Sequence, residues 1–330
     1  MRCRYAGLSA AVATVAITVG ISPAAAASPA ARALTGARAP AAAAAVFHFI
    51  RAFGSGNGMQ SGPGQFSTPG GADFAPSTGD LLVTDRMNDR VQEFLPTGKF
   101  RRAFGHQGSK PGQFRSPYGL GINKAGDIYV ADTGNNRVQE FSPARAFIRA
   151  FGKKIFTNGP SDLAVSADGD VYVADGPFIR QFTGSGHYVG SFGGTGTGPG
   201  QFNSLVAGLA IGPHDHVYAA DYSGARVEEF TRAGVYVRSL ANHGKAKVEG
   251  PTGVAVNAAM HIFVSDNGHV RAFELNPSGS LQRVFGITGK GKLDNPGPMA
   301  IDCAGNVYDL DTDVGRVQEY GNPHAPLPPC

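Results

Sequence analysis

Beyond its first 27 residues, the sequence contains no apolar run long enough to cross a membrane. It also has no stretch with the three- to four-residue apolar spacing that indicates a helix. The nine histidines are scattered, and none of them forms a group with the spacing of a metal site. These absences argue against a membrane-embedded domain, a helical domain and a histidine-based metal centre.

The N-terminal segment differs from the rest of the chain. Arg2 and Arg4 provide a basic start, residues 6–20 are almost wholly apolar, and residues 24–27 are small. This layout is typical of a secretory signal peptide, so we expect cleavage after residues 1–27 and a secreted or extracytoplasmic protein. The alternative is an uncleaved N-terminal anchor, because the apolar run is nearly long enough to span a bilayer. Residues 28–45 are rich in Ala and Pro, and we expect a spacer there.

The charge of the chain is divided unevenly. The formal net charge is +4, but residues 1–45 hold four arginines and no acidic residue. The remaining residues, 46–330, therefore carry 25 basic and 25 acidic side chains. A neutral main domain argues against nucleic acid as the partner.

One motif recurs along the chain with a nearly constant period. Its clearest copy runs from Val130 to Phe141 as VADTGNNRVQEF. The aspartate that closes the first half of each copy is found at Asp85, Asp132, Asp175, Asp221, Asp266 and Asp311, at steps of 47, 43, 46, 45 and 45 residues. A repeat of this length in which each unit is a small antiparallel sheet predicts a six-bladed β-propeller.

The second repeat shows four strands most clearly. Period-two alternation predicts strands at Tyr118–Asn123, Ile128–Ala131, Arg137–Phe141 and Ala146–Phe151. Gly126 supplies the positive φ of a tight turn between the first two strands. We name the strands of each blade a to d in chain order.

The two ends of the domain are expected to share one blade. Aromatic-glycine pairs close the repeats, and Phe53-Gly54 is such a pair with no complete repeat before it. The sixth repeat stops after its third strand, Arg316–Tyr320, and continues into a Pro-rich tail. We therefore predict that Val46–Phe53 is the missing outer strand of the sixth blade, which would close the ring and remove exposed sheet edges.

The repeats resemble the NHL repeat family. The resemblance rests on the pattern Pro-x-Gly-apolar-x-apolar, the Tyr-Val-Ala-Asp strand, Gly-Asn-Asn-Arg-Val-Gln and a closing Phe-Gly, and it covers residues 46–320. The second repeat matches closely, whereas the third, fifth and sixth depart from the pattern. The resemblance implies the propeller fold but leaves the activity open, since such relatives include binding modules, extracellular sensor domains and a few lyases.

The repeated aspartates are expected to be structural. An arginine follows five residues later in four copies, at Arg90, Arg137, Arg226 and Arg316. A carboxylate at a strand end can accept N–H groups of the next turn and pair with a guanidinium. In the third and fifth repeats we expect a loop of two residues, which would place Phe178 or His269 at the arginine position. A ring of arginines presented to an anionic ligand is the alternative interpretation, and His269 is a weak ligand-binding candidate.

The central channel offers few groups for catalysis. The first strand of each blade lines the channel, and the expected inward positions are Asp73, Gly121, Ala164, Ala210, Ala255 and Ala300. Asp162 and Asp302 lie near opposite ends of their strands, so the three acids are not expected to share one ion. His214 and His216 fall in a turn. We therefore predict no catalytic residue, no metal site and no cofactor.

Two further features are candidate sites. Asp309 replaces an apolar residue in a strand, and Asp311 and Asp313 follow it, so this stretch marks either a local ion site or loose packing in the closing blade. The glycine-rich crossing at residues 194–198, which connects the third repeat to the fourth, is not followed by a helix. This excludes a dinucleotide-binding loop.

The face formed by the b–c and d–a loops is the predicted ligand-binding face. Its candidate residues are Lys110, Arg115, Lys153, Lys154, Lys245, Lys247, Lys290 and Lys292, joined by Arg90, Arg137 and Arg226. Such a locally positive face would attract an anionic partner. The alternative is that exposed loops simply favour lysine.

Taken together, these observations favour a secreted, monomeric recognition scaffold that binds a protein or an anionic envelope ligand and has no catalysis of its own. The alternative is a propeller lyase or hydrolase with a metal at the channel mouth. Cys303 and Cys330 are the only cysteines left after export, and we expect a disulfide between them because the compartment is oxidising.

Overall fold

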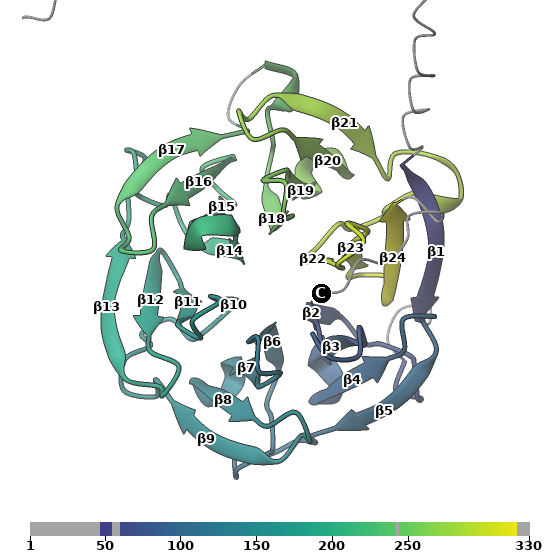
Figure 1. Cartoon of the computed structure of the whole chain (residues 1–330), viewed down its shortest axis with the longest axis vertical. Coiled ribbons are helices and arrows are strands. Elements are labelled where there is room, and N and C mark those ends of the chain that lie inside the picture. Colours follow the sequence, from purple (N-terminus) through teal and green to yellow (C-terminus); the bar gives the residue numbers. More distant parts are fainter. Residues whose placement is uncertain (1–46, 55–59, 242–243, 322–330) are drawn as a thin grey trace, which may run out of the picture. The chain divides into compact units, whose positions relative to one another are not determined.

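Six four-stranded antiparallel sheets follow one another around a central channel (Figure 1). The computed structural model describes residues 47–54, 60–241 and 244–321. In each sheet the strands lie in chain order from the channel outward, with one exception in the last blade. The predicted six-bladed β-propeller is therefore confirmed.

The blades have the following strands. Blade 1 contains β2 (Pro69–Phe74), β3 (Leu81–Asp85), β4 (Arg90–Phe94) and β5 (Phe100–Phe104). Blade 2 contains β6 (Pro117–Ile122), β7 (Ile128–Asp132), β8 (Arg137–Phe141) and β9 (Phe147–Phe151). Blade 3 contains β10 (Leu163–Val165), β11 (Val171–Asp175), β12 (Phe178–Phe182) and β13 (Tyr188–Gly193).

Blade 4 contains β14 (Val206–Ile211), β15 (Val217–Asp221), β16 (Arg226–Phe230) and β17 (Tyr236–Leu240). Blade 5 contains β18 (Pro251–Val256), β19 (Ile262–Asp266), β20 (Arg271–Leu275) and β21 (Leu281–Phe285). Blade 6 contains β22 (Met299–Ile301), β23 (Val307–Asp311), β24 (Arg316–Gly321) and β1 (His48–Gly54). Short 3-10 helices occur in loops: η1 (Arg86–Asn88), η2 (Thr133–Asn135), η3 (Pro213–Asp215), η4 (Gly244–Ala246), η5 (Asn267–His269) and η6 (Gly289–Gly291).

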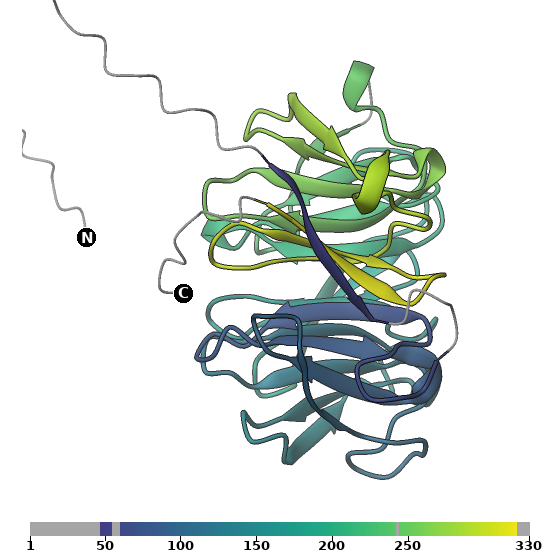
Figure 2. The same ribbon diagram turned by 90° about the vertical axis from the view of Figure 1, so that its right-hand side faces the viewer.

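The N-terminal strand closes the ring. β1 runs antiparallel to β24, with Phe49 opposite Tyr320 and Phe53 opposite Val317. Figure 2 shows β1 in purple beside the yellow strands of blade 6, the last blade in the sequence. The predicted closure of blade 6 by the N-terminal strand is confirmed. β1 is the outermost strand of blade 6, as β5 is in blade 1.

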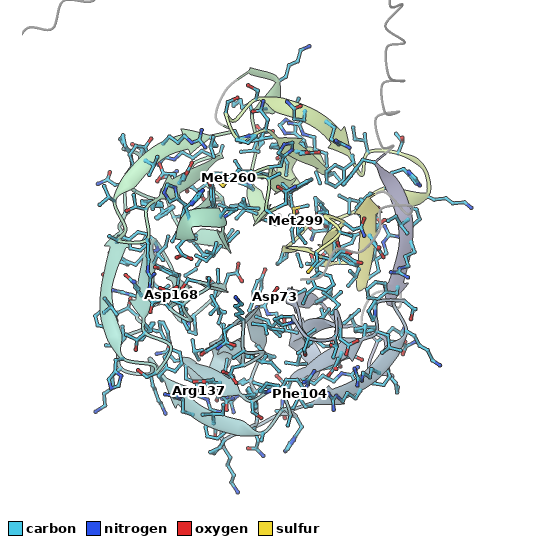
Figure 3. The ribbon with its side chains drawn as sticks, viewed as in Figure 1. Asp73, Phe104, Arg137, Asp168, Met260 and Met299 are labelled. Atoms are coloured by element: carbon cyan, nitrogen blue, oxygen red, sulfur yellow. The ribbon has the colours of Figure 1, made fainter. Side chains whose placement is uncertain are left out.

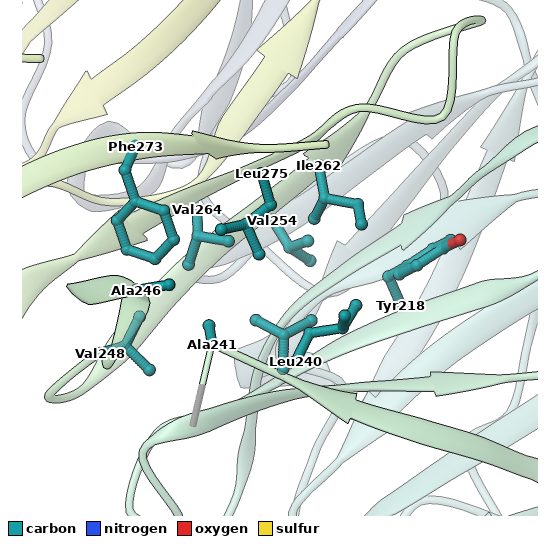
Figure 4. Close-up of a cluster of buried hydrophobic side chains, with 11 residues drawn as sticks. Tyr218, Leu240, Ala241, Ala246, Val248, Val254, Ile262, Val264, Phe273 and Leu275 are labelled. Carbon is teal, nitrogen blue, oxygen red and sulfur yellow. The ribbon is translucent and has the colours of Figure 1, made fainter. Parts of the chain in front are cut away.

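The second strand of each blade is buried along its whole length. Its apolar side chains alternate between the two neighbouring blades, because successive residues of a strand point to opposite faces. Buried apolar clusters therefore form at every blade boundary. Figure 4 shows one of them, where Tyr218 and Leu240 of blade 4 pack against Val254 and Ile262 of blade 5. Full burial of one such side chain contributes about 2 kcal/mol, so these boundaries hold the ring together.

A second repeated feature joins the third and fourth strands. In five blades a buried glutamate of strand c pairs with an arginine of strand d: Glu93 with Arg102, Glu140 with Arg149, Glu229 with Arg238, Glu274 with Arg283, and Glu319 with Arg51. The closing strand β1 thus supplies the same ion pair as the fourth strands of the other blades.

Candidate ligand-binding face and central channel

The loops divide between the two ends of the ring. We call the end that carries the b–c loops and the d–a crossings the crossing face, and the end that carries the a–b and c–d turns the turn face. Because neighbouring strands of each blade are antiparallel, every b–c loop must lie at the same end as every d–a crossing. This geometry allows the charges of the loops to be compared face by face.

Six buried aspartates tie the crossings to the blades. In blade 2, Asp132 accepts the backbone N–H of Arg115 at 2.8 Å and the Nε of Arg137 at 2.7 Å. It also accepts the side-chain amides of Asn135 and Gln139, both at 2.9 Å. The corresponding aspartates, Asp85, Asp175, Asp221, Asp266 and Asp311, are likewise fully buried and hydrogen-bonded to the crossing before them. Each aspartate therefore anchors the preceding crossing to its own blade.

The expectation that blades 3 and 5 lack the arginine was wrong. Arg180 donates its Nε to Asp175 at 2.9 Å, and Arg271 donates its Nε to Asp266 at 2.9 Å. In blade 3 the loop does shorten, so Phe178 lies opposite Asp175, but the arginine two residues later still reaches the carboxylate. In blade 5 the strand begins at Arg271, opposite Asp266. The offset of five residues therefore holds in all six blades.

The arginines of these pairs direct their remaining nitrogens toward backbone carbonyls. Arg90 donates to the carbonyls of Gly62 and Gln65, and Arg137 donates to those of Lys110 and Gln113. Arg226 donates to three crossing carbonyls, those of Thr197, Gly198 and Gln201. Each of these guanidinium groups fixes a crossing, which limits what it can offer to a ligand.

His269 occupies the place that an asparagine has in blades 1 and 2. Its Nδ1 lies 2.7 Å from Oδ2 of Asp266, and its Nε2 lies 3.4 Å from Oε2 of Glu249. Asn88 and Asn135 bond the equivalent aspartates. The imidazole is exposed. Asp266 orients it through Nδ1, and its Nε2 faces Glu249 of the preceding crossing.

The lysines of the chain gather on the crossing face. Seven of the nine lie in d–a crossings: Lys110, Lys153, Lys154, Lys245, Lys247, Lys290 and Lys292. All seven are exposed, as is Arg115, and none forms an ion pair with another described residue. The other two lysines, Lys99 and Lys124, lie in turns of the opposite face.

The two faces differ in their balance of charge. Outside the buried Asp–Arg pairs, the loops of the crossing face carry nine basic side chains (the seven lysines, Arg86 and Arg115) and five acidic ones: Asp89, Asp162, Glu249, Asp294 and Asp313. The loops of the turn face carry four basic side chains, Lys99, Lys124, Arg145 and Arg232, and six acidic ones: Asp80, Asp127, Asp168, Asp170, Asp215 and Asp302. The domain is neutral as a whole, yet its crossing face is positive.

The first strands surround a channel cavity of about 280 Å³. All six expected inward residues line it: Asp73, Gly121, Ala164, Ala210, Ala255 and Ala300. Asp73 is labelled at the channel wall in Figure 3, and its Oδ2 accepts the backbone N–H of Ile122 from the next blade at 2.7 Å. Burial raises the pKa of Asp73 to about 6, against the lowering effect of its two backbone hydrogen bonds.

Asp162 directly precedes β10 at the end of a d–a crossing, so it lies nearer to the crossing face than Asp73 does. It lines a small second cavity, and its Oδ2 accepts the N–H of Leu209 in blade 4 at 2.8 Å. Burial raises the pKa of Asp162 to about 7. Burial raises the pKa of Tyr118, and the negative charge of Asp162 raises it further. The tyrosine therefore lies close enough to Asp162 for the two groups to interact electrostatically. The guanidinium of Arg86 stacks 5.3 Å from the centre of the Tyr118 ring. The sequence did not indicate Arg86 and Tyr118, because nothing in one repeat shows that they meet.

Asp302 and Asp309 do not join the channel acids. Asp302 accepts the N–H of Asn306 in its own turn at 2.8 Å. Asp309 is fully buried, and it accepts the hydroxyl of Ser265 from blade 5 at 2.7 Å and the N–H of Gly297 at 3.3 Å. Burial raises the pKa of Asp309 to about 8. A neutral carboxyl hydrogen-bonded across the blade boundary accounts for its place in the core without an ion.

The histidines at the turn face lie beside glutamates or in solvent. His216 Nδ1 lies 2.6 Å from Oε1 of Glu229, and His214 is exposed in η3. Among the described residues, no group of three or more His, Cys, Asp or Glu side chains is arranged to hold a metal ion. No helix in the same part of the chain is long and apolar enough to cross a membrane.

Several sequence-based expectations concern residues outside the described ranges. The signal peptide, residues 1–27, and the spacer, residues 28–45, lie there, and so does Cys330. Cys303 is described in the turn between β22 and β23. The Cys303–Cys330 disulfide therefore stays a prediction.

Comparison with known proteins agrees with this architecture. Residues 114–141, which form most of blade 2, match the NHL repeat. A stretch of 74 residues is 39% identical to peptidyl-glycine alpha-amidating monooxygenase of Mus musculus, covering 20% of this chain and 8% of that protein. The matched segment is thus a small part of that relative.

Solved structures with the same fold are similar at low sequence identity. A catalytically inactive variant of virginiamycin B lyase from Staphylococcus aureus, solved with quinupristin, has a TM-score of 0.56 at 14% identity, covering 80% of this chain and 82% of that one. A streptogramin B lyase structure has a TM-score of 0.56 at 13% identity, covering 79% and 95%. The gluconolactonase XC5397 from Xanthomonas campestris has a TM-score of 0.59 at 14% identity, covering 78% and 87%. At these identities the likeness concerns the fold.

The period of the repeats and the six closed sheets lead to one conclusion: the chain is a six-bladed β-propeller, and its second blade matches the NHL repeat.

Proposed function

We propose that the protein is a recognition scaffold that binds an anionic partner on its crossing face and performs no catalysis of its own. The observation that carries this proposal is the concentration of seven of the nine lysines in the d–a crossings. Lysine is a flexible point charge with three donors, so lysines without ion pairs can adapt to carboxylate, phosphate or sulfate groups of a partner.

The contrast with the arginines supports the same conclusion. The six arginines of the Asp–Arg pairs are fixed by a buried carboxylate, and several also bond crossing carbonyls. The lysine side chains of the described crossings form no such ion pair. Four of the six crossings carry lysines, so the positive charge is spread around the ring and suits an extended ligand such as an acidic envelope polymer.

The experiment uses the mature protein and poly-L-glutamate as a soluble acidic probe. Replacing Lys153, Lys154, Lys245, Lys247, Lys290 and Lys292 with Gln should weaken binding by at least about tenfold and flatten its dependence on salt. The matched control replaces Lys99 and Lys124 of the turn face with Gln, and it should bind as the parent does. Equal binding by the parent and the six-lysine variant, with the fold intact, would refute the proposal.

The second candidate function is a lyase or hydrolase that acts at the channel mouth. The observation in its favour is the Asp162 carboxyl, whose pKa is about 7 and whose charge acts on Tyr118, the ring on which Arg86 stacks. A carboxyl with a pKa near neutrality can act as general acid or base. The lyases and the gluconolactonase of the same fold make a streptogramin B and a lactone the substrates to test.

This candidate has its own test. Turnover of streptogramin B or a lactone that disappears in Asp162→Asn would support an enzyme, and a stoichiometric metal in the purified protein would also favour one. Without turnover of either substrate, the recognition scaffold stands as the proposal.

A further inference from the structure

A pocket of about 170 Å³ lies on the turn face at the boundary of blades 1 and 2. Blade 1 contributes its a–b turn with Ser77 and Thr78, together with strands β4 and β5. Blade 2 contributes its own two turns, which include Arg145. The pocket is separate from the crossing face and from the channel.

Three arginines converge on two carboxylates in this pocket. Glu93 Oε2 lies 2.8 Å from Nε of Arg102 and 2.6 Å from Nη2 of Arg145. Arg101 pairs with Asp80, and its Nη1 also lies 3.5 Å from Oε1 of Glu93. Both carboxylates are buried. Burial by itself would raise the pKa of Glu93, but Arg102 and Arg145 together outweigh it and lower that pKa, so the carboxylate is ionised.

The charges of this pocket do not balance. The glutamates of the four other blades with this ion pair, Glu140, Glu229, Glu274 and Glu319, pair with one arginine each. Glu93 has three arginines around it, and Asp80 is the one further acid among the described residues that pair with them. One positive charge is therefore left without a partner. It lies in a site whose guanidinium groups are partly accessible, since the side chains of Arg101 and Arg102 are 40% and 46% exposed.

Arg145 reaches the pocket only through an unfavourable backbone conformation. Its φ is +66°, in the left-handed region that favours glycine. The other c–d turns have glycine at this position: Gly98, Gly186, Gly234 and Gly279, with φ values of 78°, 82°, 78° and 86°. Backbone strain of this kind is concentrated at functional sites. A glycine would build the turn without strain, so the gain from Arg145 must come from its side chain.

That side chain is not fully satisfied. It is only 12% exposed, and its buried Nε donates to no described acceptor. The hydroxyl of Thr78 accepts the N–H of Asp80, which leaves its own proton to donate. Free donors, one excess positive charge and space for a small group are therefore found together.

We propose that this pocket binds one oxyanion group of single negative charge, such as a carboxylate or a sulfate ester. Such a group would balance the third arginine and accept hydrogen bonds from guanidinium and hydroxyl donors, the strong interactions that arginine forms with oxyanions. The site would let the turn face recognise a ligand that is independent of the lysines on the other face.

A purely structural clamp between the blades is the competing explanation, because Arg145 of blade 2 also contacts Glu93 of blade 1. The two explanations differ in their response to added anions. A structural clamp has no vacant site, so added anions should not bind to it. A binding site should show saturable binding as the anion concentration rises.

The experiment measures binding of sodium acetate and sodium methyl sulfate to the mature protein by calorimetry and by the shift in melting temperature. Sodium chloride at the same ionic strength serves as the salt control. We expect saturable binding of at least one of the two oxyanions, and the preferred one identifies a planar or a tetrahedral group. Arg145→Gly, which restores the turn of the other blades, should weaken this binding at least about tenfold.

Two further variants complete the design. Arg145→Asn keeps a residue that tolerates positive φ and should lose binding to the same extent, in case the glycine variant is too unstable to assay. Arg232→Gln removes an arginine that already faces three acids, Asp168, Asp170 and Asp215, and it should bind as the parent does. The proposal is overturned if neither oxyanion binds beyond the effect of chloride, or if the Arg145 variants bind as tightly as the parent.

Discussion

Replacing Asp162 with Asn should stabilise the protein at alkaline pH and leave it unchanged in acid. Asp162 is 7% exposed in the channel wall, and burial raises its pKa from 3.8 to about 7. A carboxyl with a raised pKa in the folded state prefers to be protonated there. The contribution of Asp162 to stability therefore falls as the pH rises from about 4 to about 7, and the loss is complete above that pKa.

The size of the effect follows from the same shift. One pKa unit corresponds to about 1.4 kcal/mol, so a shift of about three units sets an upper limit of about 4 kcal/mol at pH 8. The amide oxygen of Asn can accept the N–H of Leu209 as Asp162 does, and it carries no charge to bury. We expect Asp162→Asn to gain between about 1 and about 4 kcal/mol at pH 8 relative to the parent.

The assay is equilibrium unfolding by urea at pH 4 and at pH 8 for the parent and the variant. The difference in unfolding free energy should be large at pH 8 and close to zero at pH 4, where both side chains are neutral in the folded protein. A variant that is less stable than the parent at pH 8 would refute the reasoning, because it would mean that the ionised carboxylate is favoured in the channel.

Three further predictions concern the ring and its ends. Deleting residues 46–54 should leave an open ring and a marked loss of cooperativity in thermal unfolding; a deletion variant that melts like the parent would contradict closure by β1. Arg180→Met should cost about 3 kcal/mol, because it leaves the buried carboxylate of Asp175 without its cation, and urea unfolding that shows no change would mean that backbone donors alone hold Asp175. Thiol titration of the native mature protein should find no reactive thiol if Cys303 and Cys330 are joined, and two thiols would disprove the disulfide.

The sequence was sufficient for the fold because the information is local and repeated. Each copy of the Val-Ala-Asp strand is followed by a short loop and a second apolar strand, so the pattern predicts blades without knowledge of their neighbours. The strands of blade 2 were predicted to within one residue at each end. Closure by β1 could also be predicted, since Phe53-Gly54 repeats the aromatic-glycine pair that ends four of the other five blades but has no complete repeat before it.

The candidate sites could be predicted less well from the sequence, because most of their contacts join different repeats. The pairing of Arg180 with Asp175 was missed because the short hairpin of blade 3 moves the arginine to the third residue of its strand. The meeting of Arg145 with Glu93 joins two blades, and no pattern within one repeat indicates it. One signal was available, however: Arg145 occupies the turn position where four other repeats have glycine.

The most direct test of the crossing face as the contact surface is lysine footprinting of the wild-type protein with and without bound poly-L-glutamate. All nine lysines are exposed to an amine-reactive reagent, and mass spectrometry reports the modification of each one. A contact through the crossing face predicts protection of its seven lysines, and unchanged modification of Lys99 and Lys124 on the turn face. Equal protection on both faces, or protection of Lys99 and Lys124 alone, would contradict it.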